Sequence, residues 1–248
     1  MKLIIDAGNT NIKIGYYQKN KQINFVNFPK ENIEKISLPK VNEKINLVAI
    51  GSVIPSFNER ISNKIYKAYK IKPIIISNKM FTKHFDLKKF NLNEIGTDIL
   101  GLALYLKTNY KKAMAISFGT AIFSVAVNNK QIYGVMIAPD FLSALDDLNK
   151  LTELTRTNNF NKNKKLHNWF KFGNDTPKAL AAGINHLSKG FIDNMYDYAK
   201  KEIKVNKLYV CGGRSKEMYF LNSKEYNKKI ITLSDPVIEG YYYLVKSL

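Results

Sequence analysis

Several residue types and patterns are scarce in this chain, and each scarcity excludes a class of protein. Cys211 is the one cysteine among 248 residues, so no disulfide forms within the chain and we expect a reducing, cytoplasmic location. A zinc site is not expected either, because with one cysteine the histidines would have to supply the ligands, and they are not spaced for it: His84, His167 and His186.

Long apolar runs and the common catalytic signatures are also missing. Only three apolar residues follow Met1 and Lys2 before Asp6, which is too short for a secretory signal, and no run of eighteen apolar residues predicts a membrane span. The sequence contains neither GxxxxGK[ST] nor GxGxxG, so it is not a P-loop or dinucleotide-fold protein by signature. Without GxSxG, a Ser-His-Asp hydrolase of the α/β type is not indicated.

Acidic residues are few relative to basic ones, and the net charge is +19. Such a charge is compatible with a nucleic-acid partner, which is one hypothesis for this chain. However, arginine, the preferred residue for bidentate phosphate and base contacts, occurs only three times, and the lysines are dispersed along the chain. The dispersed charge favours a solvated surface, so we do not expect a specific nucleic-acid partner or a membrane partner.

What the sequence does contain is a strand, an acidic turn and a second strand within its first sixteen residues. The apolar run 3–5 ends in Asp6, the turn Ala7-Gly8-Asn9-Thr10 follows, and apolar/polar alternation resumes at residue 12. Gly8 permits close approach of the backbone to a ligand, and Asn9 and Thr10 add short polar groups, so the turn suits phosphate oxygens. Asp6 can hold Mg²⁺, usually through water. An ordinary hairpin turn explains this segment equally well on its own.

The same pattern recurs at residues 113–127, where an apolar strand, the turn Ser117-Phe118-Gly119-Thr120 and another apolar strand follow one another. A third strand is expected at 132–137. Two copies of this strand–turn–strand motif indicate a duplicated domain. The two glycine turns would then face a nucleotide that lies between the two halves of the chain.

The remaining pattern predicts an α/β protein with a boundary near residue 110. We expect further strands at 23–28, 45–50, 73–76, 208–211 and 230–233. Helices are expected at 55–69, with Phe57, Ile61, Ile65 and Tyr66 on one apolar stripe, and at 94–107, 141–154, 177–200 and from 235 onward, with a loop at 158–171.

A second candidate site begins with Gly96-Thr97-Asp98 at the start of a predicted helix. Thr97 is expected to cap this helix and Asp98 to be a first-turn acid favoured by the helix dipole. In a phosphate-binding protein, Asp98 could instead act as a general base toward an acceptor hydroxyl. Asp175-Thr176-Pro177 is a helix-start signal with Thr176 as the expected cap, and Cys211-Gly212-Gly213 joins a strand to a helix.

Taken in order, these segments resemble the type III pantothenate kinases of the acetate and sugar kinase/actin superfamily. DAGNTNIK at 6–13 is similar to the family's nucleotide-phosphate motif, and GSVIPSFN at 51–58 to its Ser-Val-x-Pro segment. GTD at 96–98 resembles its Gly-x-Asp-Arg motif, FGTA at 118–121 its Asp-x-Gly-Thr-Ala motif, and 211–213 its terminal Gly-Gly turn.

The resemblance implies two duplicated actin-like (ribonuclease H-like) lobes, at 1–110 and 111–248, with the nucleotide cleft between them. It implies ATP-dependent phosphorylation of pantothenate at its primary hydroxyl, the first step toward coenzyme A, with Asp98 as proton acceptor and Asp6 near Mg²⁺. The residues that would contact ATP are Asp6, Ala7, Gly8, Asn9, Thr10, Asn11, Ile12, Lys13 and Thr120. Those that would contact pantothenate are Phe90, Gly96, Thr97, Asp98, Ile99 and Thr176, with Thr176 reaching a site of the partner subunit in a homodimer.

Four residues depart from the family pattern. Ile99 stands where the family has an arginine that anchors the anionic substrate, and Ser117 where an aspartate binds the monovalent cation, K⁺ or NH₄⁺. Val125 replaces a second aspartate and Asp140 replaces a glycine. These departures motivate an alternative hypothesis, a non-catalytic homologue that acts as a regulatory or binding protein. A sugar or acetate kinase of the same superfamily is the nearest enzymatic alternative.

Overall fold

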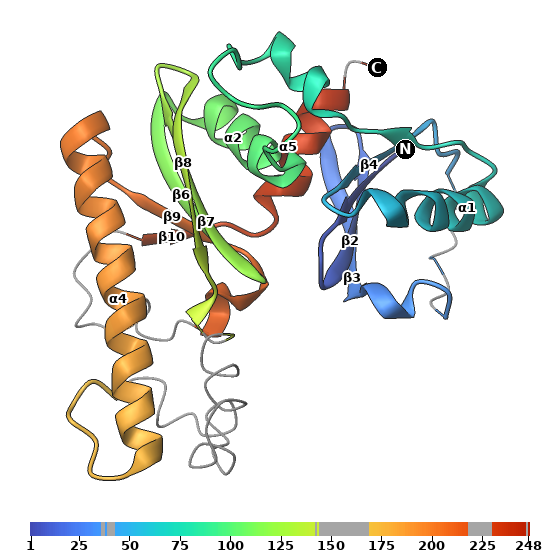
Figure 1. Ribbon diagram of the computed structural model, residues 1–248. Coiled ribbons are helices and arrows are strands. Elements are labelled where there is room, and N and C mark those ends of the chain that lie inside the picture. Colours follow the sequence, from blue (N-terminus) through green and yellow to red (C-terminus); the bar gives the residue numbers. More distant parts are fainter. Residues whose placement is uncertain (36–37, 39–42, 142, 144–168, 218–229, 247) are drawn as a thin grey trace. The chain divides into compact units, whose positions relative to one another are not determined.

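The structure, a computed structural model, describes residues 1–35, 38, 43–141, 143, 169–217, 230–246 and 248. The chain forms two compact units (Figure 1). The first unit contains Met1–Tyr110, Lys130–Ile132 and Asp235–Leu248, and the second contains Lys111–Asn129 and Tyr133–Ser234. The segment from residue 235 on, which the sequence assigned to the C-terminal lobe, therefore groups with the N-terminal one.

The first unit is built on a mixed five-stranded sheet in the order β3-β2-β1-β4-β5. The central strand β1 (Lys2–Ala7) pairs antiparallel with β2 (Asn11–Gln18) and parallel with β4 (Leu47–Ser52). The edges are β3 (Lys21–Pro29) and the two-residue β5 (Ile74–Ile75). Apolar residues alternate along β1 and β2, as expected of strands buried on at least one face.

Alternation along β1 sends its side chains to two different faces of this sheet. Leu3, Ile5 and Ala7 join a core to which α1 (Asn58–Tyr69) contributes Ile61 and Ile65. Asp6 points to the opposite face, because successive strand residues alternate. That face is covered by α5 (Pro236–Val245), which packs against α2 (Thr97–Asn109).

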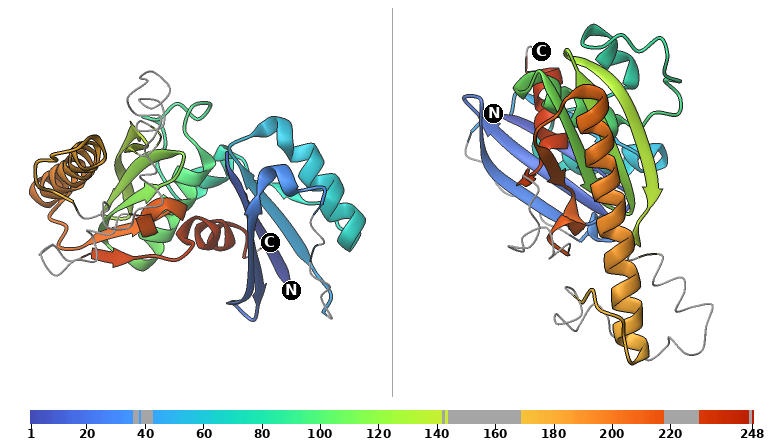
Figure 2. Two further views of the ribbon diagram at one scale, coloured as in Figure 1. Left: turned by 90° about the horizontal axis from the view of Figure 1, so that it is seen from below. Right: turned by 90° about the vertical axis from the view of Figure 1, so that its left-hand side faces the viewer.

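The second unit repeats this architecture with β6 (Lys112–Phe118) as its central strand. It pairs antiparallel with β7 (Ala121–Asn128) and parallel with β9 (Leu208–Cys211). The outer strands are β8 (Gln131–Pro139) and β10 (Ile230–Thr232), in the order β10-β9-β6-β7-β8. The 28-residue helix α4 (Thr176–Ile203) packs on one face through Ile192, Tyr196 and Ile203 (Figures 1 and 2).

Both sheets therefore have the same connectivity: a three-stranded meander whose first strand is central, followed by two parallel strands on its other side. This confirms the duplicated α/β fold with mixed sheets and flanking helices. In the described part of the chain, no helix is long and apolar enough to span a bilayer.

Several element boundaries differ from the sequence expectation. The helix expected from residue 94 begins at Thr97, the helix expected from residue 55 begins with a 3₁₀ turn at Pro55–Phe57, and the strand expected at 73–76 is reduced to β5. Tyr66 is 54 % exposed and lies off the buried stripe of α1, because Ile61 and Ile65 already fill the space against the sheet. Most of the helix expected at 141–154 and of the loop expected at 158–171 lies outside the described residues.

Candidate active site

The candidate site of the first unit lies at the carboxyl ends of the adjacent parallel strands β1 and β4. Asp6 is opposite Lys13 on β2 and beside Gly51 on β4. The turn after Asp6 is closed by the Gly8 amide, which donates to the Asn11 carbonyl at 3.0 Å. The segment after β4 is tied to the same place because the Val53 amide donates to the Ala7 carbonyl at 3.2 Å. Two of the sequence motifs, 6–13 and 51–58, are thus adjacent.

The third motif, 96–98, reaches these strands through the N-terminus of α2. The Thr97 hydroxyl donates to the Ser52 carbonyl at 3.2 Å, which joins the start of α2 to the end of β4. Thr97 therefore does not cap α2 as expected. The cap position is held by Gly96, which has no side chain to bond the first amides of the helix. A helix N-terminus without a capping side chain leaves amide groups and the positive end of the helix dipole for an anion.

Two carboxylates occupy this position, and burial raises the pKa of both. The pKa of Asp6 rises to about 7, mainly through desolvation and also through the charges of Asp98 and Asp235, while Lys13 lowers it. Desolvation also raises the pKa of Asp98, against the hydrogen bond that its Oδ1 accepts from the Ile99 amide at 2.9 Å. Asp6 and Asp98 thus lie close enough for the charge of Asp98 to raise the pKa of Asp6.

Lys13 and Asp235 form an ion pair beside Asp6. The Lys13 Nζ lies 3.1 Å from Asp235 Oδ1, and both side chains are largely buried. Asp235 is the cap residue of α5 but makes no capping hydrogen bond with its side chain. The carboxylate that could cap α5 instead pairs with Lys13, which links the C-terminal helix to the first hairpin.

Tyr241 is a residue of this site that the sequence motifs did not predict. It lies on α5, its side chain is fully buried, and its ring fills the space above Gly51 of β4 and Gly101 of α2. Burial and the charges of Asp6 and Asp98 raise the pKa of Tyr241 well above its usual value, while the neighbouring Thr97 hydroxyl lowers it. The next residue of α5, Tyr242, is also buried.

The second unit places its own glycine turns at the equivalent strand ends. Ser117 ends the pairing of β6 with β9, opposite Cys211, and the Gly119 amide donates to the Ala121 carbonyl at 3.2 Å. Gly212 follows β9 with φ +92°, and a Cβ there would lie 2.2 Å from the Phe118 carbonyl oxygen. Only glycine fits this approach, so the turns 117–120 and 211–213 are in contact.

A buried ion pair lies next to these turns. Asp140, only 1 % exposed, accepts hydrogen bonds through Oδ2 from the Ser143 amide and hydroxyl, at 2.8 and 2.9 Å, and pairs with Arg214. Asp140 is one of the departures from the family pattern, and Arg214 directly follows the Gly-Gly turn. The charge introduced by Asp140 is therefore compensated within the second unit.

The other predicted contact residues differ in accessibility. Asn9, Thr10, Thr120 and Thr176 are exposed, and Asn11, Phe90 and Gly96 are partly buried. The side chains of Ile12 and Ile99 lie in the protein interior. Thr176 is the first residue of α4, but the capping bond comes from Asp175, which accepts from the Lys178 amide at 2.8 Å. The residue that caps α4 is thus Asp175, one position before the expected Thr176.

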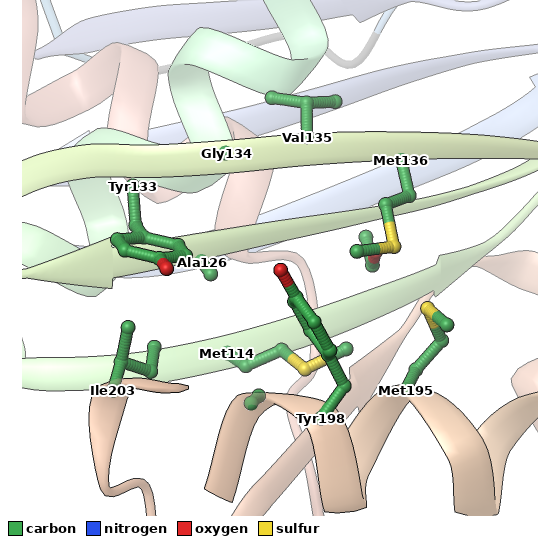
Figure 3. A pocket seen from close by; sticks show the side chains of 11 residues that line it. Met114, Ala126, Tyr133, Gly134, Val135, Met136, Met195, Tyr198 and Ile203 are labelled. Carbon is green, nitrogen blue, oxygen red and sulfur yellow. The ribbon is translucent and has the colours of Figure 1, made fainter. Parts of the chain in front are cut away.

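Another hollow, of about 200 Å³, lies between α4 and the sheet of the second unit (Figure 3). Tyr133 of β8 and Tyr198 of α4 point into it, together with the thioethers of Met114, Met136 and Met195. Neither a carboxylate nor a basic side chain is among the described residues that line it, so it does not have the composition of a phosphate or metal site.

The donor set around Asp6 fits Mg²⁺ of the kind that is held mainly by substrate and water. The described residues contain no group of three or more His, Cys, Asp or Glu side chains that could enclose an ion. A partly accessible carboxylate next to a turn of backbone amides nevertheless suits Mg²⁺, which commonly uses one or two carboxylates plus phosphates and waters.

Comparison with known proteins identifies the family. The model of the family described as type III pantothenate kinase matches residues 2–198, which include three of the clustered motifs. The chain belongs to the type III pantothenate kinase family. It is 33 % identical over 247 residues to the type III pantothenate kinase of Malacoplasma penetrans, with 93 % of each chain covered. The corresponding kinase of Mycoplasma mobile is 31 % identical over 271 residues, with 99 % of this chain and 100 % of the relative covered.

Solved structures with the same fold agree with the two-unit architecture of this family member. A Campylobacter jejuni protein assigned to the Baf family of transcriptional activators has a TM-score of 0.62 at 16 % identity, covering 99 % of this chain and 98 % of that chain. The activator of the 2-hydroxyisocaproyl-CoA dehydratase from Clostridium difficile, with bound ADPNP, has a TM-score of 0.51 at 14 % identity, covering 99 % and 96 %. At these identities the likeness concerns the fold alone.

Proposed function

We propose that this protein transfers the γ-phosphoryl group of ATP to the primary hydroxyl of pantothenate. The observation that carries the proposal is the convergence of three family motifs, 6–13, 51–58 and 96–98, at the carboxyl ends of β1 and β4. Ligands bind at this edge of parallel strands in many α/β proteins. Family membership supplies the substrate, and the clustered carboxylates supply groups suited to the reaction.

Asp98 is the proton acceptor in this proposal. A general base works best when its pKa lies near the working pH, and burial shifts the pKa of Asp98 in that direction. Its position in the first turn of α2 places it beside amide groups that favour anions. Asp98 would orient the acceptor hydroxyl and take its proton as the phosphoryl group is transferred.

Asp6 is the carboxylate that would hold Mg²⁺, and the ion, when bound, would neutralise charge on the triphosphate. The turn 7–11 offers backbone and side-chain donors to phosphate oxygens, and Lys13 adds a positive charge beside Asp6. Ile12 is buried, so we propose that it contributes only through its backbone. We further propose Thr120, in the turn after β6, as a residue that contacts ATP.

Pantothenate would contact Phe90, Gly96, Thr97, Asp98 and, from a partner subunit, Thr176. Ile99 is 6 % exposed and lacks the charge of the family's arginine, so it cannot anchor the substrate carboxylate as that arginine does. Loss of a charge-assisted contact weakens binding, so we expect a raised KM for pantothenate relative to relatives that carry the arginine.

Turnover of the wild-type protein and of Asp98→Asn tests this function. With ATP and Mg²⁺, we expect pantothenate-dependent release of ADP, and a decrease of at least about a hundredfold in kcat for Asp98→Asn, the usual contribution of a general base. A panel with sugars and acetate in place of pantothenate checks the acceptor. Nucleotide binding without any turnover would instead support the non-catalytic alternative, and near-normal kcat in Asp98→Asn would contradict the role of Asp98.

We also propose a cytoplasmic homodimer. Gly183, Leu187 and Gly190 are exposed at helical spacing on α4, and Cβ atoms added at the two glycines would contact nothing within 4 Å in the described part of the chain. This leaves room for a second copy to approach the helix that begins at Thr176. Light scattering measures the mass, and Leu187→Lys is expected to shift it toward the monomer.

A further inference from the structure

Three glycines create the position of Tyr241. A Cβ on Gly51 would lie 2.2 Å from the Cε2 and Cζ atoms of the Tyr241 ring, and a Cβ on Gly101 would lie 2.8 Å from its Cε1. Gly240 allows the helix that carries Tyr241 to approach α2, because a Cβ there would lie 1.8 Å from the Gly101 carbonyl oxygen. Real Cβ contacts are never this short, so each of these positions accepts only glycine while Tyr241 stays in place.

The hydroxyl of Tyr241 lies over the face of the sheet to which the Asp6 side chain points. Gly51 and Asp6 are direct partners in the parallel pairing of β4 with β1, so their side-chain directions share one face of the sheet. The Tyr241 Oη would be 2.7 Å from a Cβ on Gly51, which places it over the strand neighbour of Asp6. The charges of Asp6 and Asp98 both act on Tyr241.

This hydroxyl is fully buried and, among the described residues, makes no hydrogen bond of normal geometry. Packing alone does not explain why residue 241 is a tyrosine, since a phenylalanine ring would fill the same space without burying an unpaired hydroxyl. Buried polar groups in folded proteins are almost always paired, and an exception needs a functional explanation.

We propose that Tyr241 is a positioning residue of the phosphoryl-transfer site. Its hydroxyl donates a hydrogen bond to the Asp6 carboxylate when nucleotide binds, and so holds that carboxylate in the orientation that meets the triphosphate. The inference rests on the proposed function for the identity of the ligand. Tyr241 touches neither substrate nor the reacting atoms and acts through Asp6.

Tyr241→Phe tests this role because it removes the hydroxyl alone and keeps the ring above Gly51 and Gly101. We expect kcat to fall about tenfold, the affinity for the Mg²⁺ complex of a non-hydrolysable ATP analogue to weaken about tenfold, and KM for pantothenate to change less than twofold. The midpoint of thermal unfolding without ligand should stay the same or rise. A structural role would give the reverse, a lower midpoint with unchanged kcat and affinity, and would overturn the proposal.

Tyr242→Phe is the matched control, since Tyr242 is the next residue of α5 and its hydroxyl pairs with Asn20. It should leave kcat and analogue affinity within twofold of the wild-type values. A mutant cycle adds a second test: if Tyr241 acts through Asp6, the double variant Asp6→Asn/Tyr241→Phe should bind the analogue no more weakly than Asp6→Asn. Additive losses would overturn the inference.

The binding measurements separate this inference from the proposed function. If the wild-type protein binds the analogue but does not phosphorylate pantothenate, the proposed function fails, and the mutant cycle still decides the role of Tyr241. If the wild-type protein turns over pantothenate and Tyr241→Phe matches it in kcat and affinity, the function stands and the inference fails.

Discussion

At the scale of single residues, the unusual feature of this protein is a carboxylate, Asp6, whose pKa lies near neutrality. The pKa of Asp6 is raised from 3.8 to about 7 by desolvation and two neighbouring carboxylates, with Lys13 alone opposing them. In the pH range between these two values the native state binds more protons than the unfolded state. Stability therefore decreases as pH rises from about 4 to about 7. The ionised carboxylate of Asp6 therefore lowers the free energy of unfolding of the unliganded protein at neutral pH.

Asp6→Asn should remove this pH dependence. At pH 8, with EDTA and no nucleotide, we expect the variant to be more stable than the wild-type protein by on the order of 1 kcal/mol, a value that allows for the partial exposure of Asp6. At about pH 2.5 the two proteins should differ least in stability, because Asp6 is then almost fully protonated in both the folded and the unfolded state. Urea unfolding at several pH values measures this, and a constant difference across the range would contradict it.

At the scale of elements, α2 and α5 of the first unit pack with their backbones close together. The two helices meet at Gly101 and Gly240, and the ring of Tyr241 then lies between α2 and β4. The contact fixes the N-terminal turn of α2 relative to the strand ends, because Thr97 is bonded to Ser52 at the same place. Helices can pack this closely only where glycines let the two backbones come into contact.

Gly240→Ala should separate these helices. Its Cβ would lie 1.8 Å from the Gly101 carbonyl oxygen, which is backbone and cannot rotate away. We expect a loss of about 3 kcal/mol in unfolding free energy, at the upper end of overpacking effects. Thermal or urea unfolding measures it.

Gly134→Ala is the control for this change. Its Cβ would meet nothing within 4 Å among the described residues, and alanine suits a strand better than glycine does. Equal losses in the two variants would show that tight packing is not the cause.

The contacts between elements also explain which features could be predicted from the sequence and which could not. The hairpins around Asp6 and Ser117 were predictable because alternation and turn residues are local signals. The cap role of Thr97 was predicted wrongly because its hydroxyl is used by a carbonyl 45 residues away, which no local pattern contains. Tyr241 and the Lys13–Asp235 pair were not predictable as site residues for the same reason. An aromatic run such as 241–243 is typical of buried residues, but the sequence does not show which residues Tyr241 packs against.

At the scale of the whole molecule, the two units share a topology but differ in chemistry. The first unit carries Asp6 at the end of its central strand, whereas the second carries Ser117, only 8 % exposed, at the corresponding place. Val125 of β7 is an apolar core residue. Ser117 thus stands where the family resemblance implies an aspartate for a monovalent cation, and Val125 replaces a second aspartate of the same hairpin, so neither position carries a charge.

We therefore expect turnover without a specific requirement for K⁺. Replacing K⁺ with Na⁺ or Tris at constant ionic strength should change kcat less than twofold, because a hydroxyl and an isopropyl group do not supply the charged oxygen ligands that hold such a cation. An ADP-release assay in each salt measures the effect. A decrease of tenfold or more on removing K⁺ would show that other residues bind the cation.

The grouping of helix α5 with the first unit bears on how the protein is made. The ribosome releases the N-terminal residues first, yet the face of their sheet that carries Asp6 is covered by residues 235–248. Until those residues emerge from the exit tunnel, this half of the nascent polypeptide keeps an open apolar surface. The Asp6 face of the first sheet is therefore covered only after the residues of the second unit have been translated.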